Sequence, residues 1–177
     1  MPLDRLHALP PRFSAAPAVP VEISVANRTA LGVRRCEVTA PEETWAAVYA
    51  GPSCHECWSF LVWRNVELLG HVYREAVGQH TEDEHTRKGL GSVVLEVALQ
   101  DSLPPVSDRE GMTYWAFRMW HRRALQGGAA ILDLKTGATA EPDSRKWHEL
   151  WHDAEGCERF QLVFWPSGLA SAGAVLA

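Results

Sequence analysis

Hydrophobic residues recur with a period of two in several short stretches, which is the period of a strand that buries one face. Val21, Ile23 and Val25 form the first such stretch. Further strands are expected over short, largely apolar segments at residues 33–38, 58–64, 68–73, 129–134 and 160–165. Strands 58–64 and 68–73 are predicted to form a hairpin around Asn65, because only a short connection separates them.

Helical spacing of apolar residues predicts three helices. The first begins at a capping box over residues 39–42 and ends at Gly51-Pro52. The second is an aromatic helix over residues 112–126, which follows another capping box and closes at Gly127-Gly128. A short third helix is expected over residues 145–154.

Three segments between these elements follow weaker patterns. Residues 92–99 fit a helix entered through Gly89 and Gly91, but their alternation and β-branched content favour a strand. Residues 79–88 are polar and hold a run of three acidic side chains, so we expect a loop. Leu103-Pro-Pro105 is expected to break the chain after that stretch.

The sum of these elements predicts an α+β protein, with a mainly antiparallel sheet and two to three helices packed on one face. Residues 1–20 are rich in Ala and Pro and are expected to form an extended N-terminal arm. Residues 21–166 are expected to form a single domain, and residues 167–177 a C-terminal tail.

Composition narrows the classes of function. The net charge of −5 argues against a general nucleic-acid binder, which would show a basic face. No apolar run reaches the roughly 18–20 residues of a membrane span, so no membrane partner is expected. The four cysteines are too scattered for a disulfide framework, which favours a reducing, cytoplasmic location. The eight tryptophans fit either an aromatic core or a recognition surface.

Two motifs carry the residue types of a zinc site. Cys54 and Cys57 form a Cys-x-x-Cys pair, and His148 and His152 are the two histidines of a His-Glu-x-x-His sequence. Brought together, these four side chains would make a closed, structural Cys2His2 site. The alternative is two buried thiols at the start of a strand and two histidines on the outer face of an amphipathic helix.

The segment Asp83-Glu-His-Thr-Arg-Lys-Gly-Leu-Gly91 resembles the acyl-CoA-binding segment of the GCN5-related N-acetyltransferases. The resemblance implies that a basic, glycine-containing loop opens a helix and that its amides bind the pyrophosphate of acetyl-CoA. Arg87, Gly89 and Gly91 are the positions carried over. Thr86 stands where that family has Arg or Gln.

The resemblance to the acetyltransferases also involves the flanking elements. Val33–Cys36 and Pro41–Tyr49 are similar to the family's first strand and helix. The family pattern requires a strand before the glycine loop. The sequence leaves only the short polar stretch at residues 78–80 for it. The pattern also requires a strand after the following helix, where Pro104 and Pro105 leave none expected.

The block from Trp115 to Gly137 is a helix, two glycines, a strand and a turn, and it is similar to one in small α+β immunity proteins of bacterial polymorphic-toxin systems. This resemblance implies a protein-binding module that inhibits a protein partner, such as a toxin, by tight association and without a cofactor. The sequence favours this function, because no complete catalytic set can be named. The expected contact residues are Glu82, Asp83, Glu84, Trp115, Trp120 and Trp147. The alternatives are an acetyl-CoA-dependent N-acetyltransferase and a zinc-binding protein.

Overall fold

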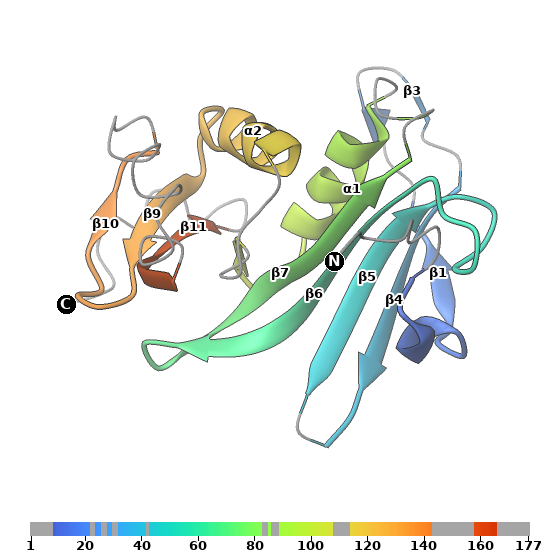
Figure 1. Ribbon diagram of the computed structural model, residues 1–177, viewed down its shortest axis with the longest axis horizontal. Coiled ribbons are helices and arrows are strands. Elements are labelled where there is room, and N and C mark those ends of the chain that lie inside the picture. Colours follow the sequence, from blue (N-terminus) through green and yellow to red (C-terminus); the bar gives the residue numbers. More distant parts are fainter. Residues whose placement is uncertain are drawn as a thin grey trace. The chain divides into compact units, whose positions relative to one another are not determined.

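The computed structural model describes residues 9–21, 24, 25, 28, 29, 32–41, 43–82, 85, 89–107, 114–142 and 158–165. These residues form a nine-stranded sheet with the order β1-β4-β5-β6-β7-β8-β11-β9-β10, and β2 and β3 form a separate two-stranded sheet. Figure 1 shows β4 to β7 as successive neighbouring arrows. The strands are β1 (Ala18–Pro20), β2 (Ser24–Val25), β3 (Arg28–Thr29), β4 (Val33–Thr39), β5 (Thr44–Ala50), β6 (Ser59–Leu68), β7 (His71–Thr81), β8 (Pro105–Val106), β9 (Ala129–Asp133), β10 (Thr139–Ala140) and β11 (Phe160–Phe164).

The helices of the described chain are few and short: the 3-10 helix η1 (Pro11–Phe13), α1 (Leu90–Leu99) and α2 (Tyr114–Ala124). The prediction of an α+β protein with helices packed on a mainly antiparallel sheet is therefore wrong. The fold is dominated by a mixed sheet, in which β7 and β8 are parallel. The α2 prediction is confirmed, whereas the expected helix at 145–154 and the tail at 167–177 lie outside the described residues.

The segment expected to be the first helix is the strand β5. It pairs along both edges, with Val48 opposite Arg35 on β4 and opposite Leu61 on β6. Residues 46–50 are all buried, so the apolar run continues on both faces of the strand. A strand buried on both faces cannot be distinguished by periodicity from a buried helix, which is why the capping box misled the prediction.

The segment expected to be a strand at 92–99 is instead the helix α1. Gly89 precedes it with φ of 77°, and the N–H of Val93 donates to the carbonyl oxygen of Gly89 at 3.1 Å. Val94 and Leu95 are buried, as are the residues at 97–99. Burial over such a wide part of the helix surface produces the apolar run that resembled alternation.

Strand β7 is longer than the sequence indicates. The turn lies at Leu69-Gly70, where φ is 53° and 76°, rather than around Asn65. From there β7 continues to Thr81, into the polar segment expected to be a loop. The hydroxyls of Ser59 and Thr81 lie 2.8 Å apart, so the polar end of this strand is held by side-chain hydrogen bonding as well as by the sheet.

The chain divides into two compact units. Unit 1 comprises Met1–Asn65 and Val77–Ala98, and unit 2 comprises Val66–Ala76 and Leu99–Ala177. Strands β6 and β7 each contribute residues to both units.

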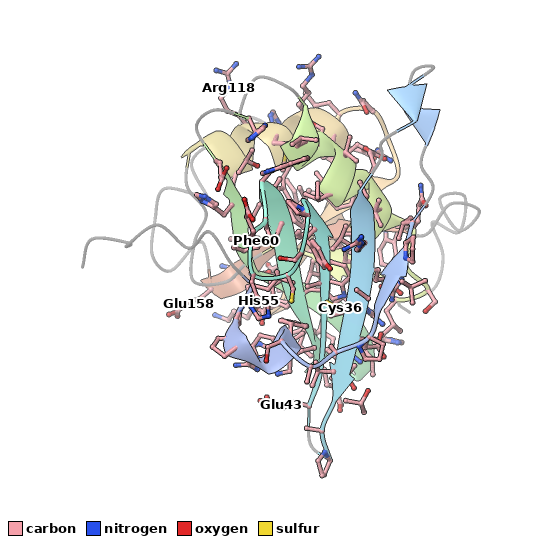
Figure 2. The ribbon with its side chains drawn as sticks, turned by 90° about the vertical axis from the view of Figure 1, so that its right-hand side faces the viewer. Cys36, Glu43, His55, Phe60, Arg118 and Glu158 are labelled. Carbon is pink, nitrogen blue, oxygen red and sulfur yellow. The ribbon has the colours of Figure 1, made fainter. Side chains whose placement is uncertain are left out.

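The core of unit 1 joins the sheet to the N-terminal segment. Phe13 of η1 is fully buried, and Leu9 belongs to the same apolar cluster as Cys36 and Phe60, which Figure 2 labels. The remaining buried members of the cluster are Ala47, Tyr49, Cys57 and Val62. From Leu9 onward, the segment expected to be an arm thus contributes to the core, and β1 pairs with β4.

One core cluster of unit 2 comprises Leu68, Tyr73, Val106, Leu132 and Val163. Buried polar bonds reinforce it. The N–H of Ser107 donates to the carbonyl oxygen of Leu162, and the N–H of Leu162 donates to Ser107 Oγ, both at 2.9 Å. These bonds continue the antiparallel pairing of β8 with β11 beyond Val106.

Candidate functional site

The end of β7 and the start of α1 form the candidate site, which lies within unit 1. The N–H of Glu82, just after β7, donates to the carbonyl oxygen of Trp58 at 2.9 Å. The N–H of His85 then donates to the carbonyl oxygen of Glu82 at 2.8 Å. Helix α1 begins five residues further on, at Leu90. Strand β7 therefore leads directly into a short connection that opens a helix (Figure 1).

The N-terminal end of α1 has the features of an anion-binding helix end. Gly89 adopts the left-handed conformation, which glycine accepts without strain. Gly91 and Ser92 occupy the first turn, which contains no acidic residue. The first N–H groups of a helix have no partner within the helix, and the helix dipole makes this end attractive to negative charge. The end of α1 can thus bind a phosphate through backbone amides.

Aromatic and polar contacts position the connection between β7 and α1. The rings of Trp58 and His85 stack with centroids 5.3 Å apart and planes inclined by 23°. His85 Nε2 also lies 3.9 Å from a carboxylate oxygen of Glu82. These contacts come from three positions that sequence reasoning did not associate, since Trp58 and His85 carry no shared motif and meet only through the fold.

Strand β8 follows α1 in the chain, and its residues belong to unit 2. It runs parallel to β7, with Arg74 opposite Pro105 and Glu75 opposite Val106. The N–H of Arg74 donates to the carbonyl oxygen of Pro104 at 2.9 Å. The expectation that the two prolines leave no strand here is therefore wrong. Proline lacks only the N–H, so it is tolerated at the first residue of a strand.

A buried ion pair supports this parallel pairing. Arg74 Nη1 lies 2.8 Å from a carboxylate oxygen of Asp101, and both side chains are more than nine-tenths buried. Asp101 also accepts a hydrogen bond from the N–H of Ser102 at 2.8 Å. Asp101 follows α1, so the pair joins the chain after the helix to the strand that precedes it.

The two cysteines proposed as zinc ligands lie in unit 1, just before β6. Cys57 is fully buried, and burial raises the pKa of its thiol to about 11. Its thiol donates to the carbonyl oxygens of Ser53 and Cys54, at 3.3 and 3.4 Å. Zinc binds the thiolate form, which this burial disfavours.

The other proposed zinc ligands, His148 and His152, lie outside the described residues. Within the part of the chain that the structure describes, no group of three or more His, Cys, Asp or Glu side chains has the geometry of a metal site. The zinc interpretation therefore stays a prediction.

The residues expected to bind a partner do not form one described surface. Trp120 is only 1% exposed and contacts Phe164 edge-on, with centroids 5.6 Å apart, so it serves the core of unit 2. Glu82 is half-buried at the end of β7. The side chain of Trp115 is not among those described, and Asp83, Glu84, Trp147 and the expected phosphate ligand Arg87 lie outside the described residues.

No α-helix among the described residues is long and apolar enough to cross a membrane. Comparisons with protein-family models, with curated proteins and with solved structures found no match. The function must therefore be argued from the site itself.

Proposed function

We propose that this protein binds acyl-coenzyme A at the N-terminal end of α1 and transfers the acyl group to an amine, as the GCN5-related N-acetyltransferases do. The observation that carries the proposal is the order of elements around the glycine loop. Strand β7 leads through Gly89 into α1, and α1 is followed by β8, which is parallel to β7. The two strands that the sequence left out of the family pattern are thus both present.

The chemistry of the loop agrees with this order. Coenzyme A carries a pyrophosphate, and the helix end offers amides and a favourable dipole to such an anion. In the sequence, Arg87 and Lys88 directly precede Gly89 and would add positive charge close to the same end. The proposal assigns Gly89 and Gly91 to phosphate binding through their backbone and assigns no catalytic residue.

One part of the resemblance is not supported. Residues Pro41–Tyr49 were compared with the family's first helix, but Thr44–Ala50 form β5. The proposal therefore rests on β7, α1 and β8 alone. The immunity-protein interpretation has less support, because Trp120 is a core residue rather than a surface contact.

Thermal unfolding with and without acetyl-CoA tests the proposal. A ligand that binds only the native protein stabilises it by about 2.7 kcal/mol when its concentration is a hundred times Kd. We expect millimolar acetyl-CoA and free coenzyme A to raise Tm, and adenosine, which has no pyrophosphate, to leave it unchanged. An unchanged Tm with acetyl-CoA at this concentration would contradict the proposal.

A charge variant locates the binding site. Ser92 is exposed in the first turn of α1, and Ser92→Asp places a carboxylate where the pyrophosphate would lie. An acidic residue near a helix N-terminus favours the helix, so the ligand-free protein should be as stable as the wild type or slightly more so. We expect the Kd for acetyl-CoA to rise by about tenfold or more, measured by calorimetry.

Gln100→Glu is the matched control for this variant. Gln100 is exposed directly after α1, so the variant adds the same charge at the opposite end of the same helix. The Kd should stay close to that of the wild type. Equal weakening by both variants would show that net charge, rather than the helix end, controls binding.

A further inference from the structure

The turn that carries Cys54 and leads to Cys57 is tightly folded. Ser53 and Glu56 pair as an isolated bridge, with N–H···O distances of 3.3 and 3.4 Å in the two directions. Gly51, which precedes this turn, would place an added Cβ 2.6 Å from the carbonyl oxygen of Glu56. Only glycine fits so close to the returning backbone, and the corner therefore holds the two cysteines in one defined arrangement.

The thiol of Cys57 already lies beside the backbone of Cys54. Its sulfur is 3.4 Å from the carbonyl oxygen of Cys54, and that oxygen is three bonds from the Cβ of the same residue. A disulfide needs the two Cβ atoms about 3.5–4.5 Å apart. The 3.4 Å contact between the Cys57 sulfur and the Cys54 backbone places the two residues side by side, and the proposal requires rotation of their side chains to join the sulfurs.

The two thiols differ in their access to solvent. Cys57 is fully buried, whereas Cys54 is half-buried. Cys36, a third thiol in the same apolar cluster, is buried as well, and burial raises its pKa to about 11. An oxidant from solvent therefore reaches Cys54 before the other two.

We propose that Cys54 and Cys57 form a peroxide-sensitive dithiol, in which Cys54 reacts first and Cys57 then closes the disulfide. Hydrogen peroxide transfers one oxygen to the sulfur of Cys54, which becomes a sulfenic acid, and one water leaves. The Cys57 thiol, which burial keeps protonated, loses its proton as its sulfur attacks. The S–O bond breaks as the S–S bond forms, and the departing hydroxide takes up that proton and leaves as a second water. The dithiol loses two electrons and two protons in total, and the peroxide is reduced to two waters.

Formation of the Cys54–Cys57 disulfide would affect the N-terminal segment at Leu9 and the connection after β7. The N–H of Leu9 donates to the carbonyl oxygen of Cys54 at 3.0 Å, which ties the N-terminal segment to the turn. Trp58, adjacent to Cys57, accepts the hydrogen bond from Glu82 and stacks on His85. The inference goes beyond the proposed function and does not depend on it.

Peptide mapping by mass spectrometry tests the proposal on the full chain. After treatment with hydrogen peroxide, the peptide that contains Cys54 and Cys57 should lose two hydrogen masses and regain them with dithiothreitol. Cys36 should stay reduced. A first disulfide that includes Cys36 or Cys157, or conversion of Cys54 to sulfinic acid without any linkage, would overturn the proposal.

Two variants separate the roles of the thiols. Cys54→Ser removes the accessible thiol, so oxidation of the buried Cys57 should slow by on the order of tenfold. Cys36→Ala is the matched control, because it removes a buried thiol from the same cluster, and the linkage should form at the wild-type rate. If Cys57 is oxidised as fast in Cys54→Ser as in the wild type, Cys54 is not the reactive thiol.

Discussion

Helices α1 and α2 are almost equal in length, with ten and eleven residues, but their sequences differ in kind. Helix α1 is apolar over most of its surface and has neither an acidic residue in its first turn nor a basic residue in its last turn. Helix α2 has a narrow buried face and three basic residues in its last turn. Helix α1 therefore depends on packing against the rest of the protein, whereas the sequence of α2 itself favours a helix through its apolar face and its basic last turn. The N-terminal end of α1 is the part of the helix to which we assign acyl-coenzyme A binding.

The largest effect is expected in α2. Trp120 is almost fully buried against Phe164, so Trp120→Ala should lower the free energy of unfolding by about 3–5 kcal/mol. Urea-induced unfolding measures this change. If the variant stays folded, its Kd for acetyl-CoA should remain close to that of the wild type, because the site lies at α1. Tenfold weaker binding by a folded Trp120→Ala protein would contradict the separation of the two roles.

An intermediate effect is expected at the entry of α1. Gly89 has φ of 77°, and an added Cβ would meet nothing within 4 Å, so the cost of Gly89→Ala comes from the backbone alone. The free energy of unfolding should fall by about 1–2 kcal/mol.

Gly91→Ala is the matched control for Gly89→Ala. Gly91 lies within α1 and is not among the residues of positive φ. Alanine is favoured over glycine in a helix, so this variant should raise the free energy of unfolding by about 0.5–1 kcal/mol. If the two variants change the free energy of unfolding in the same direction, α1 does not begin between Gly89 and Gly91 as the structure has it.

The smallest effect is expected at the C-terminal end of α2. Arg123 Nη1 donates to the carbonyl oxygen of Gly127 at 3.2 Å, and a cation near a helix C-terminus is also favoured by the dipole. Arg123→Ala should therefore lower the free energy of unfolding by about 0.3–1 kcal/mol in urea. Arg122→Ala, at an exposed position of the same turn, should cost less. Arg118 is also on α2 and is labelled in Figure 2, but it is too far from the last turn for the same role.

The same contrast explains what the sequence could predict. Helix α2 was predicted correctly because its buried face shows a clear period, and strands β9 and β11 because each is a short, largely apolar run. Helix α1 was predicted as a strand and strand β5 as a helix, because each is buried on so much of its surface that its apolar residues show no distinct period. Packing, rather than local preference, decides such segments.

The candidate site was predictable only in part. Gly89 and Gly91 were identified from the loop sequence, and the structure places both at the start of α1. Strand β8 was missed because two prolines precede Val106, and the end of β7 was missed because its residues are polar. Trp58 and His85 come together only through pairing between β6 and the end of β7, which no local pattern records.

Residues Val66–Ala76 form the tip of the β6–β7 hairpin and belong to unit 2, although unit 1 comes before and after them in the chain. Unit 1 is therefore discontinuous in sequence. A protein truncated after Ala98 would keep all of unit 1 but would leave this tip without the residues it packs with, such as Val106, Leu132 and Val163. Separate expression of the two halves is thus a poor route to either one. During synthesis, the tip is also made before the rest of unit 2, so its apolar residues can be buried only after later core residues, up to Val163, have been added.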